Sequence, residues 1–320
     1  MTRRDFLRLS VATAVVGIPR ASSAQPPGDA GGLKEVRIGY QKTGVLVIAR
    51  QQGVLEARLA KYGTAVKWIE FTSGPPLLEA MNVASVDVGA TGDSPPIFAQ
   101  SAGAAIVYVA GGPINNGQSI IVQPQSPIRS LADLRGKRIG FTKGSSAHNI
   151  TIAALEKAGI AYTEIIPVHL SPADAAAAFA RGSIDAWAIW DPFLAMAEKT
   201  QGARVLVNAA DVAKTYSFYL ANRTFAAKYP KALGEVLAGL GEAASWAENH
   251  RDGVARSLAA VTGVRLDIQT IAANRATFPF GPVTDEIITA QQGVADRYFR
   301  LGLIPAPIRV REAMWAAPQS

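Results

Sequence analysis

The chain has 320 residues, of which 49% are hydrophobic and 18% charged, with 29 glycines, 19 prolines and no cysteine. This composition is typical of a globular protein large enough for two domains, and it excludes a disordered, fibrous or disulfide-stabilised chain. The lack of cysteine also excludes zinc fingers, iron–sulfur clusters and thiol nucleophiles. His169 and His250 have no partner at metal-ligand spacing, so we interpret both as structural and expect no metal and no cofactor.

The N-terminal segment 1–24 is predicted to be an export signal that is removed from the mature protein. Arg3 and Arg4 lie in a charged segment ahead of a short apolar stretch at 9–18, and a run of small residues then ends at Ala24. The arginine pair resembles a twin-arginine signal, with an ordinary secretory signal as the alternative. We expect cleavage after Ala24 and export of the remainder.

The charge balance does not favour a nucleic-acid partner. The net charge of +7 includes a net +3 from the signal, which contains Arg3, Arg4, Arg8, Arg20 and Asp5, so the mature chain carries +4. Its basic residues are not clustered as nucleic-acid binding requires, whereas a mild positive charge is compatible with an anionic small ligand. No uninterrupted apolar run reaches the length that spans a membrane.

Two segments of the sequence occur twice, about 100 residues apart. Residues 37–42 (RIGYQK) match 138–143 (RIGFTK) at an offset of 101. The tripeptide at 85–87 (SVD) matches 183–185 (SID) at an offset of 98, and an aspartate follows each of them six residues later. We infer two lobes of similar build.

Both lobes alternate β-rich and helical segments, which predicts an α/β fold with right-handed βαβ units and mainly parallel sheets covered on both faces. Strands are predicted in the first lobe at 36–40, 66–71, 86–90 and 105–110, and in the second at 120–123, 138–141, 165–169, 185–190 and 204–207. Helices are predicted at 46–53, 75–83, 147–158, 173–181 and 192–200. From Arg223 onward the pattern is almost wholly helical, and we expect this tail to return to the first lobe.

The predicted division places 25–117 and 217–320 in a discontinuous lobe 1 and 118–216 in lobe 2. Two crossovers, near 117–120 and 214–217, join the lobes. A small interface between lobes leaves them free to rotate, so we expect a monomer that closes on its ligand like a hinge.

Ligands of open α/β sheets bind at the carboxyl ends of the strands, and three polar strand-to-helix turns lie at such ends. They are 90–96, which contains Asp93, 143–149 (KGSSAHN), and 190–192, which contains Asp191. Free N–H groups and the positive end of the helix macrodipole make the start of a helix an anion site. Three helix starts that face one cleft would therefore hold an oxyanion without an arginine. The simpler interpretation is capping, which we expect as the primary role of Asp93 and Asp191.

Two further side chains at these turns have open roles. His148, in the first turn of a predicted helix, donates to an anion or bonds a neighbour. Trp187 and Trp190 lie three residues apart on a predicted strand and therefore point to opposite faces. Trp190, at the strand end, is the candidate for the ligand cleft, and Trp187 for the core.

Five motifs together resemble the periplasmic aliphatic-sulfonate-binding proteins of ABC importers, the SsuA type. They are 39–42 (GYQK), 91–100 (TGDSPPIFAQ), 143–149 (KGSSAHN), 185–192 (DAWAIWDP) and 217–221 (SFYLA). The resemblance runs from about Val36 to Trp315. It implies a type II periplasmic-binding fold that closes on a sulfonate and passes it to a membrane permease for sulfur uptake. Tyr216 stands where a smaller residue is expected, and would narrow the pocket for the ligand's tail.

A sulfonate is a monoanion of low basicity with three acceptor oxygens, so neutral donors suffice to bind it. The carboxylates of Asp93 and Asp191 would disfavour a dianion such as sulfate. Trp190 and Tyr219 are predicted to wall the apolar tail. The residues predicted at the head group are Gln41, Gly92, Ser94, Ser145, Ser146 and His148, and Gly144 is a further predicted ligand-binding residue.

Other functions remain as alternatives. Relatives that bind nitrate or taurine have similar folds, and the resemblance extends at a distance to desulfinases with a cysteine nucleophile, which this chain lacks. A serine hydrolase would need Ser145 or Ser146 beside a general base, and no G-x-S-x-G elbow surrounds them. A structural or adhesive module is disfavoured by the polar motifs at the strand ends. We expect a binding protein rather than an enzyme.

Overall fold

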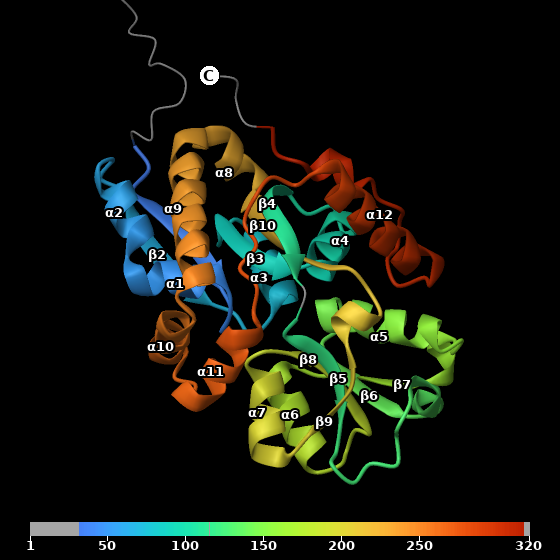
Figure 1. The fold of residues 1–320 in the computed structure, drawn as a ribbon. Helices are drawn as coiled ribbons and strands as arrows, with labels where there is room; N and C mark the ends of the chain where they lie inside the picture. The colour runs from blue at the N-terminus through green and yellow to red at the C-terminus, as the bar shows by residue number, and fades with distance from the viewer. Residues whose placement is uncertain (1–31, 115, 317–320) are drawn as a thin grey trace, which may run out of the picture.

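The structure, a computed structural model, describes residues 32–114 and 116–316. The predicted export signal lies outside these residues. Two five-stranded sheets form the centres of two α/β lobes, which lie one above the other in Figure 1. We call the first sheet with the helices packed on it lobe 1, and the second sheet with its helices lobe 2.

Lobe 1 is built from two stretches of the chain. The first stretch contains β1 (Glu35–Tyr40), α1 (Val45–Gln52), α2 (Val54–Ala60), β2 (Ala65–Glu70), α3 (Gly74–Asn82), β3 (Val88–Gly92), α4 (Ser94–Ser101) and β4 (Ile106–Ile114). The second contains β10 (Thr215–Asn222), α8 (Arg223–Lys228), α9 (Pro230–Asn249), α10 (Arg251–Thr262), α11 (Leu266–Arg275) and α12 (Asp285–Arg300). The strand order is β2-β1-β3-β10-β4.

Lobe 2 is continuous and repeats this plan. It contains β5 (Gln118–Val122), β6 (Arg138–Phe141), α5 (Ser146–Lys157), β7 (Ile166–His169), α6 (Pro172–Ala180), β8 (Ala186–Trp190), α7 (Phe193–Gln201) and β9 (Arg204–Asn208). Its strand order, β7-β6-β8-β5-β9, is that of lobe 1 with equivalent strands substituted. The predicted α/β class is confirmed.

One strand in each sheet departs from the predicted parallel arrangement. β10 pairs antiparallel with β3 and β4, and β5 pairs antiparallel with β8 and β9. These are the strands by which the chain enters from the other lobe, and each is inserted between two strands of the sheet that receives it. β10 is absent from the predicted elements, because it lies where the sequence changes to its helical tail.

The repeated motifs of the sequence form the same interaction in both lobes. In lobe 1 the backbone N–H and the Nε of Arg37 donate to Asp87 Oδ2 at 2.7 and 2.9 Å. In lobe 2 the same two groups of Arg138 donate to Asp185 Oδ2 at 2.8 and 3.1 Å. Each pair joins equivalent strands, β1 in lobe 1 and β6 in lobe 2, to the turn that precedes the neighbouring strand, β3 or β8. The repeat therefore encodes a structural Arg–Asp ion pair in each lobe, and we call these two pairs the Arg–Asp ties.

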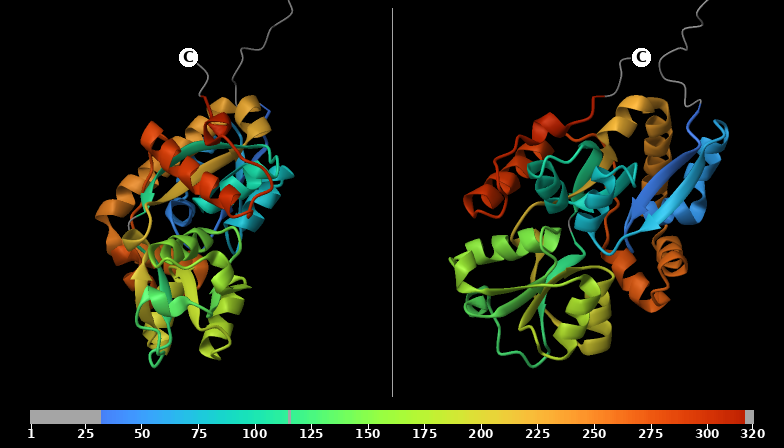
Figure 2. Two further views of the ribbon diagram at one scale, coloured as in Figure 1. Left: turned by 90° about the vertical axis from the view of Figure 1, so that its right-hand side faces the viewer. Right: turned by 180° about the vertical axis from the view of Figure 1, so that it is seen from behind.

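The helical tail returns to lobe 1, as the sequence predicts. α9 packs on α1 and α2, and α10 packs on α1. These helices lie together in Figure 1, and Figure 2 shows the two lobes from the side and from behind. Buried apolar residues of both stretches share one core, including Ile48, Leu55, Leu233 and Leu240. None of the helices in residues 32–114 and 116–316 is both long and apolar enough to cross a membrane.

The two Arg–Asp ties differ in burial, and this difference predicts their energies. The Asp87 side chain is 5% exposed and that of Asp185 is 30% exposed. Replacing Asp87 with Ala leaves a buried N–H and a guanidinium without their acceptor, and we expect a loss of about 2–4 kcal/mol in the free energy of unfolding. Asp185→Ala serves as the matched comparison, with an expected loss of about 1 kcal/mol. Urea unfolding measures both, and equal losses would contradict the assignment.

Candidate functional site

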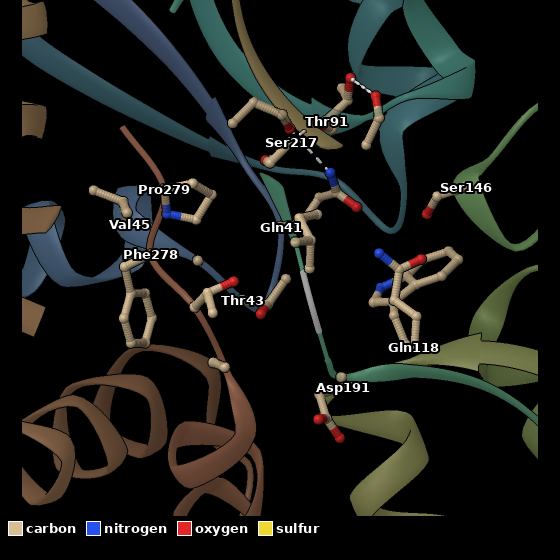
Figure 3. A pocket seen from close by; sticks show the side chains of 18 of the residues that line it. Gln41, Thr43, Val45, Thr91, Gln118, Ser146, Asp191, Ser217, Phe278 and Pro279 are labelled. Atoms are coloured by element: carbon tan, nitrogen blue, oxygen red, sulfur yellow. Dashed lines mark hydrogen bonds between the residues drawn. The ribbon is translucent and has the colours of Figure 1, made fainter. Parts of the chain in front are cut away.

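A pocket lies between the two lobes, where the carboxyl ends of strands from both sheets meet. Its volume is about 150 Å³, and one water needs about 10–15 Å³ by the same measure, so a ligand of several non-hydrogen atoms fits. Lobe 1 contributes the ends of β1 and β3, the start of α1, and the segment after α11; lobe 2 contributes the starts of β5 and α5 and the end of β8. Figure 3 shows the pocket from close by.

Two helices begin at the pocket without a side-chain cap. The residues that line it include Gly44, Val45 and Leu46 at the start of α1, and Ser145 and Ser146 at the start of α5. Neither N-cap residue, Gly44 nor Ser145, accepts a helix N–H group with its side chain. Uncapped N–H groups and the positive ends of two macrodipoles therefore face the same space from opposite lobes, an arrangement that favours an anion.

Seven of the eleven predicted site residues line this pocket: Gln41, Gly92, Ser145, Ser146, Trp190, Asp191 and Tyr219. Their donors are not equally available. The Ser145 hydroxyl donates to the Thr142 carbonyl at 2.7 Å, as expected for a simple turn. One N–H of the Gln41 amide donates to the Ala90 carbonyl at 3.1 Å, and the other remains for a ligand. The Ser146 hydroxyl points into the pocket (Figure 3).

Gly92 allows the two lobes to approach each other at the pocket wall. A Cβ atom at this position would lie 2.9 Å from Ser146 Cβ and 3.0 Å from Ser146 Oγ, closer than side chains pack. Gly92 belongs to β3 of lobe 1 and Ser146 to α5 of lobe 2. A side chain at position 92 would therefore separate the lobes or displace the Ser146 hydroxyl.

The other four predicted residues, Asp93, Ser94, Gly144 and His148, are not among the residues that line the pocket. His148 is fully buried, and its ring stacks on Phe141 with 4.8 Å between centroids. Its Nδ1 accepts the N–H of Gly144 at 3.3 Å, and its Nε2 lies 3.1 Å from the Tyr162 hydroxyl. Burial lowers the pKa of His148 to about 3, so the ring is neutral. His148 therefore bonds neighbouring residues, which is one of the two roles that the sequence left open.

Asp93 does not cap α4 through its side chain, contrary to the prediction. It has helical backbone angles, φ −66° and ψ −41°, and its carboxylate accepts the Ser94 hydroxyl at 2.8 Å and the Asn149 amide at 2.9 Å. The Ser94 hydroxyl also lies 2.7 Å from the Tyr298 hydroxyl. The Asn149 bond joins lobe 2 to lobe 1. Burial raises the pKa of Asp93 to about 6, although the two hydrogen bonds act in the opposite direction.

Asp191, the equivalent residue of lobe 2, caps its helix and pairs with the other lobe. Its Oδ1 accepts the Ala195 N–H in the first turn of α7 at 2.9 Å. Its Oδ2 lies 3.1 Å from Nε of Arg275 in α11, whose Nη2 lies 2.5 Å from Glu198. Its carboxylate points away from Ser146 in Figure 3. Burial raises the pKa of Asp191 to about 6, and Arg275 opposes this.

The aromatic residues follow strand alternation. Trp187 is 1% exposed in the core and Trp190 lines the pocket, as predicted. Tyr219 is buried, and its hydroxyl donates to the Pro279 carbonyl at 3.3 Å. Tyr216 does not line this pocket, so it does not narrow it as expected; its ring packs beside Phe218 on the other face of β10.

Sequence reasoning missed a second group of lining residues. Thr43 and the start of α1 follow the GYQK motif, and their position ahead of an apolar helix could have indicated them. Gln118, Ser217 and the segment 276–279 also line the pocket. Nothing in the sequence marks a single glutamine at a strand start, and Phe278 and Pro279 come to the pocket only through the packing of the tail.

The lining residues in the described part of the chain include no lysine and no arginine. Nor do the described residues contain a group of three or more histidine, aspartate and glutamate side chains placed to hold a metal ion. Amide, hydroxyl and backbone N–H donors gather at one end, around Gln41, Gln118 and Ser146, and Val45, Phe278 and Pro279 form an apolar end (Figure 3). Such a pocket holds a weakly basic anion that has a short apolar part.

Two lobes of equivalent topology, connected by two crossing strands and with a pocket between them, define a bilobal binding protein of the type II periplasmic-binding fold. A family model described as "NMT1/THI5 like" matches residues 59–253. An Escherichia coli (strain K12) protein whose name describes binding of aliphatic sulfonates is 39% identical over 99% of this chain and 98% of its own length. The chain belongs to this family of aliphatic-sulfonate-binding proteins.

Solved structures agree with this assignment. The alkanesulfonate-binding protein SsuA from Xanthomonas axonopodis pv. citri, bound to MOPS, is 40% identical with a TM-score of 0.83, over 88% of this chain and 98% of that one. The periplasmic aliphatic sulphonate binding protein SsuA from Escherichia coli is 40% identical with a TM-score of 0.81, over 90% and 94%. The desulfurization enzyme DSZB, 17% identical with a TM-score of 0.65 over 88% and 96%, shares the fold.

The raised pKa of Asp93 predicts a pH dependence of stability. The native state holds this proton with a pKa of about 6, against an ordinary value of 3.8. Between these values the folded protein binds more protons than the unfolded chain, so the contribution of Asp93 to stability falls as pH rises through the window. Relative to Asp93→Asn, the wild type is expected to gain unfolding free energy as pH is lowered from 7.5 to 5. Asp296→Asn, at an exposed acid on α12, is the control, and parallel pH profiles for wild type and Asp93→Asn would refute the prediction.

The pair between Arg275 and Asp191 joins the lobes on one side of the pocket, and its loss is expected to favour opening. The side chains of Arg275, Asp191 and Glu198 are 24, 9 and 29% exposed. Arg275→Gln removes the pair at a cost of about 1 kcal/mol, or roughly a fivefold shift toward open forms. Small-angle scattering should then show a larger mean radius of gyration. Arg265→Gln, whose partner Asp267 lies in the same lobe, is the control; identical scattering from both variants would show that the pair does not hold the lobes.

Proposed function

We propose that this protein captures aliphatic sulfonates outside the cytoplasm and delivers them to the permease of an ABC importer for sulfur uptake. The observation that carries the proposal is a pocket with two uncapped helix starts, neutral donors at one end and no basic side chain. A sulfonate spreads one negative charge over three oxygens of low basicity, so neutral N–H and O–H donors bind it without a counter-charge. The relatives named for aliphatic sulfonates support the same ligand class.

The two ends of the pocket correspond to the two parts of such a ligand. We place the head group at the polar end, among Gln41, Ser146 and the N–H groups at the start of α5. The tail is directed toward Trp190, Tyr219 and Phe278, all of which line the pocket. The carboxylates of Asp93 and Asp191 are engaged with partners outside the pocket, and they disfavour a second negative charge nearby.

The remaining parts of the proposal concern cellular context. We propose a periplasmic protein, exported by the signal at 1–24, that works as a monomer and closes by rotation about the segments at 117–120 and 214–217. The division into 25–117 with 217–320 and 118–216 belongs to this proposal. We also propose that the protein binds its ligand without converting it, since the family relatives are named as binding proteins.

The test is a series of ligands that differ in length and charge. Calorimetry with methane-, ethane-, propane- and butanesulfonate should show affinity rising about fourfold per CH₂, from about 0.8 kcal/mol each, until the pocket is full. Ser146→Ala should weaken binding roughly tenfold to a hundredfold, because it removes a hydrogen bond to a charged group. Ser101→Ala, whose hydroxyl donates to Ala306 outside the pocket, is the control.

Four results would each oppose a part of the proposal. An equal stabilisation by sulfate would indicate a sulfate-binding protein, and an equal stabilisation by nitrate a nitrate-binding one, because the melting temperature rises with binding to the native state. Recovery of a chemically altered sulfonate, detected by mass spectrometry, would indicate an enzyme. Unchanged affinity in Ser146→Ala would place the head group elsewhere.

A further inference from the structure

Asn149 of α5 connects lobe 2 to two charged residues of lobe 1. Its Nδ2 donates to Asp93 Oδ2 at 2.9 Å, and its Oδ1 accepts from Arg297 Nη1 at 2.8 Å. Asp93 lies between β3 and α4, and Arg297 lies in α12, which runs above α5 in Figure 1. A carboxylate only accepts and a guanidinium only donates, so the amide has one orientation and a charged partner at each end.

The two hydrogen bonds are shielded from water. Asp93 and Asn149 are fully buried, and the side chain of Arg297 is 22% exposed. Next to Asn149, the ring of His148 lies 5.5 Å from the ring of Tyr298 of lobe 1, measured between centroids. Hydrogen bonds to charged groups are the strong ones, and a low local dielectric strengthens them further. Rotation of the lobes away from each other would break both bonds, because Asn149 moves with lobe 2.

The amide lies one helical turn beyond Ser146, whose hydroxyl points into the pocket (Figure 3). Ser146 packs against Gly92 so closely that a Cβ atom there would lie 2.9 Å from its own Cβ. The next residue, Asp93, bonds Asn149. Two successive residues of lobe 1 therefore contact two successive turns of α5, which fixes the start of this helix against the end of β3.

We infer that Asn149 is a positioning residue: its bonds to Asp93 and Arg297 hold the lobes together and keep the Ser146 hydroxyl at the pocket. Asn149 itself is not among the residues that line the pocket. Its loss should therefore weaken every ligand by the same factor, because affinity falls with the fraction of molecules in the binding-competent form. The inference rests on the lobe closure that belongs to the proposed function.

The test exchanges the two side chains. Asn149→Asp places a second carboxylate against Asp93, and at pH 8, above the Asp93 pKa of about 6, their repulsion should favour opening. Calorimetry should show ethanesulfonate and butanesulfonate weakened by one common factor, roughly tenfold to a hundredfold. Adding Asp93→Asn restores a donor opposite the new carboxylate, which also faces Arg297. The double variant should therefore bind within about threefold of the wild type.

A second variant and a matched control accompany the exchange. Arg297→Met keeps the apolar stem and removes the other hydrogen bond, so it should weaken both sulfonates about threefold to tenfold, even if Asn149→Asp does not fold. Thr151→Val is the control on α5. Thr151 is also buried, but its hydroxyl donates to the Ala147 carbonyl of the same helix at 2.8 Å, so affinity should not change.

The distance between the lobes gives a measurement that needs no ligand. The sequence has no cysteine, so Thr289→Cys on α12 and Thr163→Cys in lobe 2, both at exposed positions, can carry a pair of spin labels. Electron–electron resonance should show longer distances in Asn149→Asp than in the wild type, and the wild-type distances should return in the double variant.

Unchanged distances in Asn149→Asp would overturn the inference, as would a double variant that binds as weakly as the single one. A loss of affinity that differs between the two sulfonates would also overturn it, because Asn149 would then act on the ligand itself. If the wild type binds neither sulfonate while the distances change as expected, the proposed function fails and the contact between the lobes stands.

Discussion

The position of the pocket follows from one covalent constraint: the chain passes twice between the sheets, and each passage ends in a strand inserted antiparallel beside β3 or β8. Because β5 and β10 hold the two sheets together near their carboxyl edges, the strand ends of one lobe must face those of the other. The turns after these strands are the places where side chains and helix starts are freest to contact a ligand. The Arg37–Asp87 and Arg138–Asp185 ties then fix equivalent strands within each lobe.

The sequence indicated the fold better than the direction in which individual side chains point. Its repeats, strand alternation and strand-to-helix turns are local signals, and the structure contains the elements that they predict. His148 was misplaced because successive helical residues turn by about 100°, so that two residues beyond Ser146 the side chain faces the core. Tyr216 was misjudged because β10 was not recognised, and alternation along that strand directs Ser217 to the pocket and Tyr216 away from it. Gln118 and Phe278 depend on contacts between distant segments, which no local pattern reveals.

Asp93 and Asp191 occupy equivalent positions in the two lobes, and each contacts the opposite lobe through a different partner. Both carboxylates follow equivalent strands and are buried. Asp93 accepts from Asn149 of lobe 2, and Asp191 pairs with Arg275 of lobe 1, so each carboxylate meets the opposite lobe. Arg275 thereby compensates the charge of Asp191 from outside the pocket lining, and the carboxylate of Asp93 is satisfied by neutral donors. Helix dipoles and neutral donors therefore determine the electrostatic potential inside the pocket.

The facing starts of α1 and α5 have a consequence for motion. Each carries the positive end of a helix dipole, and the lobe closure that we propose would bring the two ends together. Over an empty space these like poles repel each other, whereas an anion between them is attracted to both. Under the proposed function, the geometry that binds the ligand would therefore also make closure depend on a bound anion, and the closed shape would indicate a filled pocket.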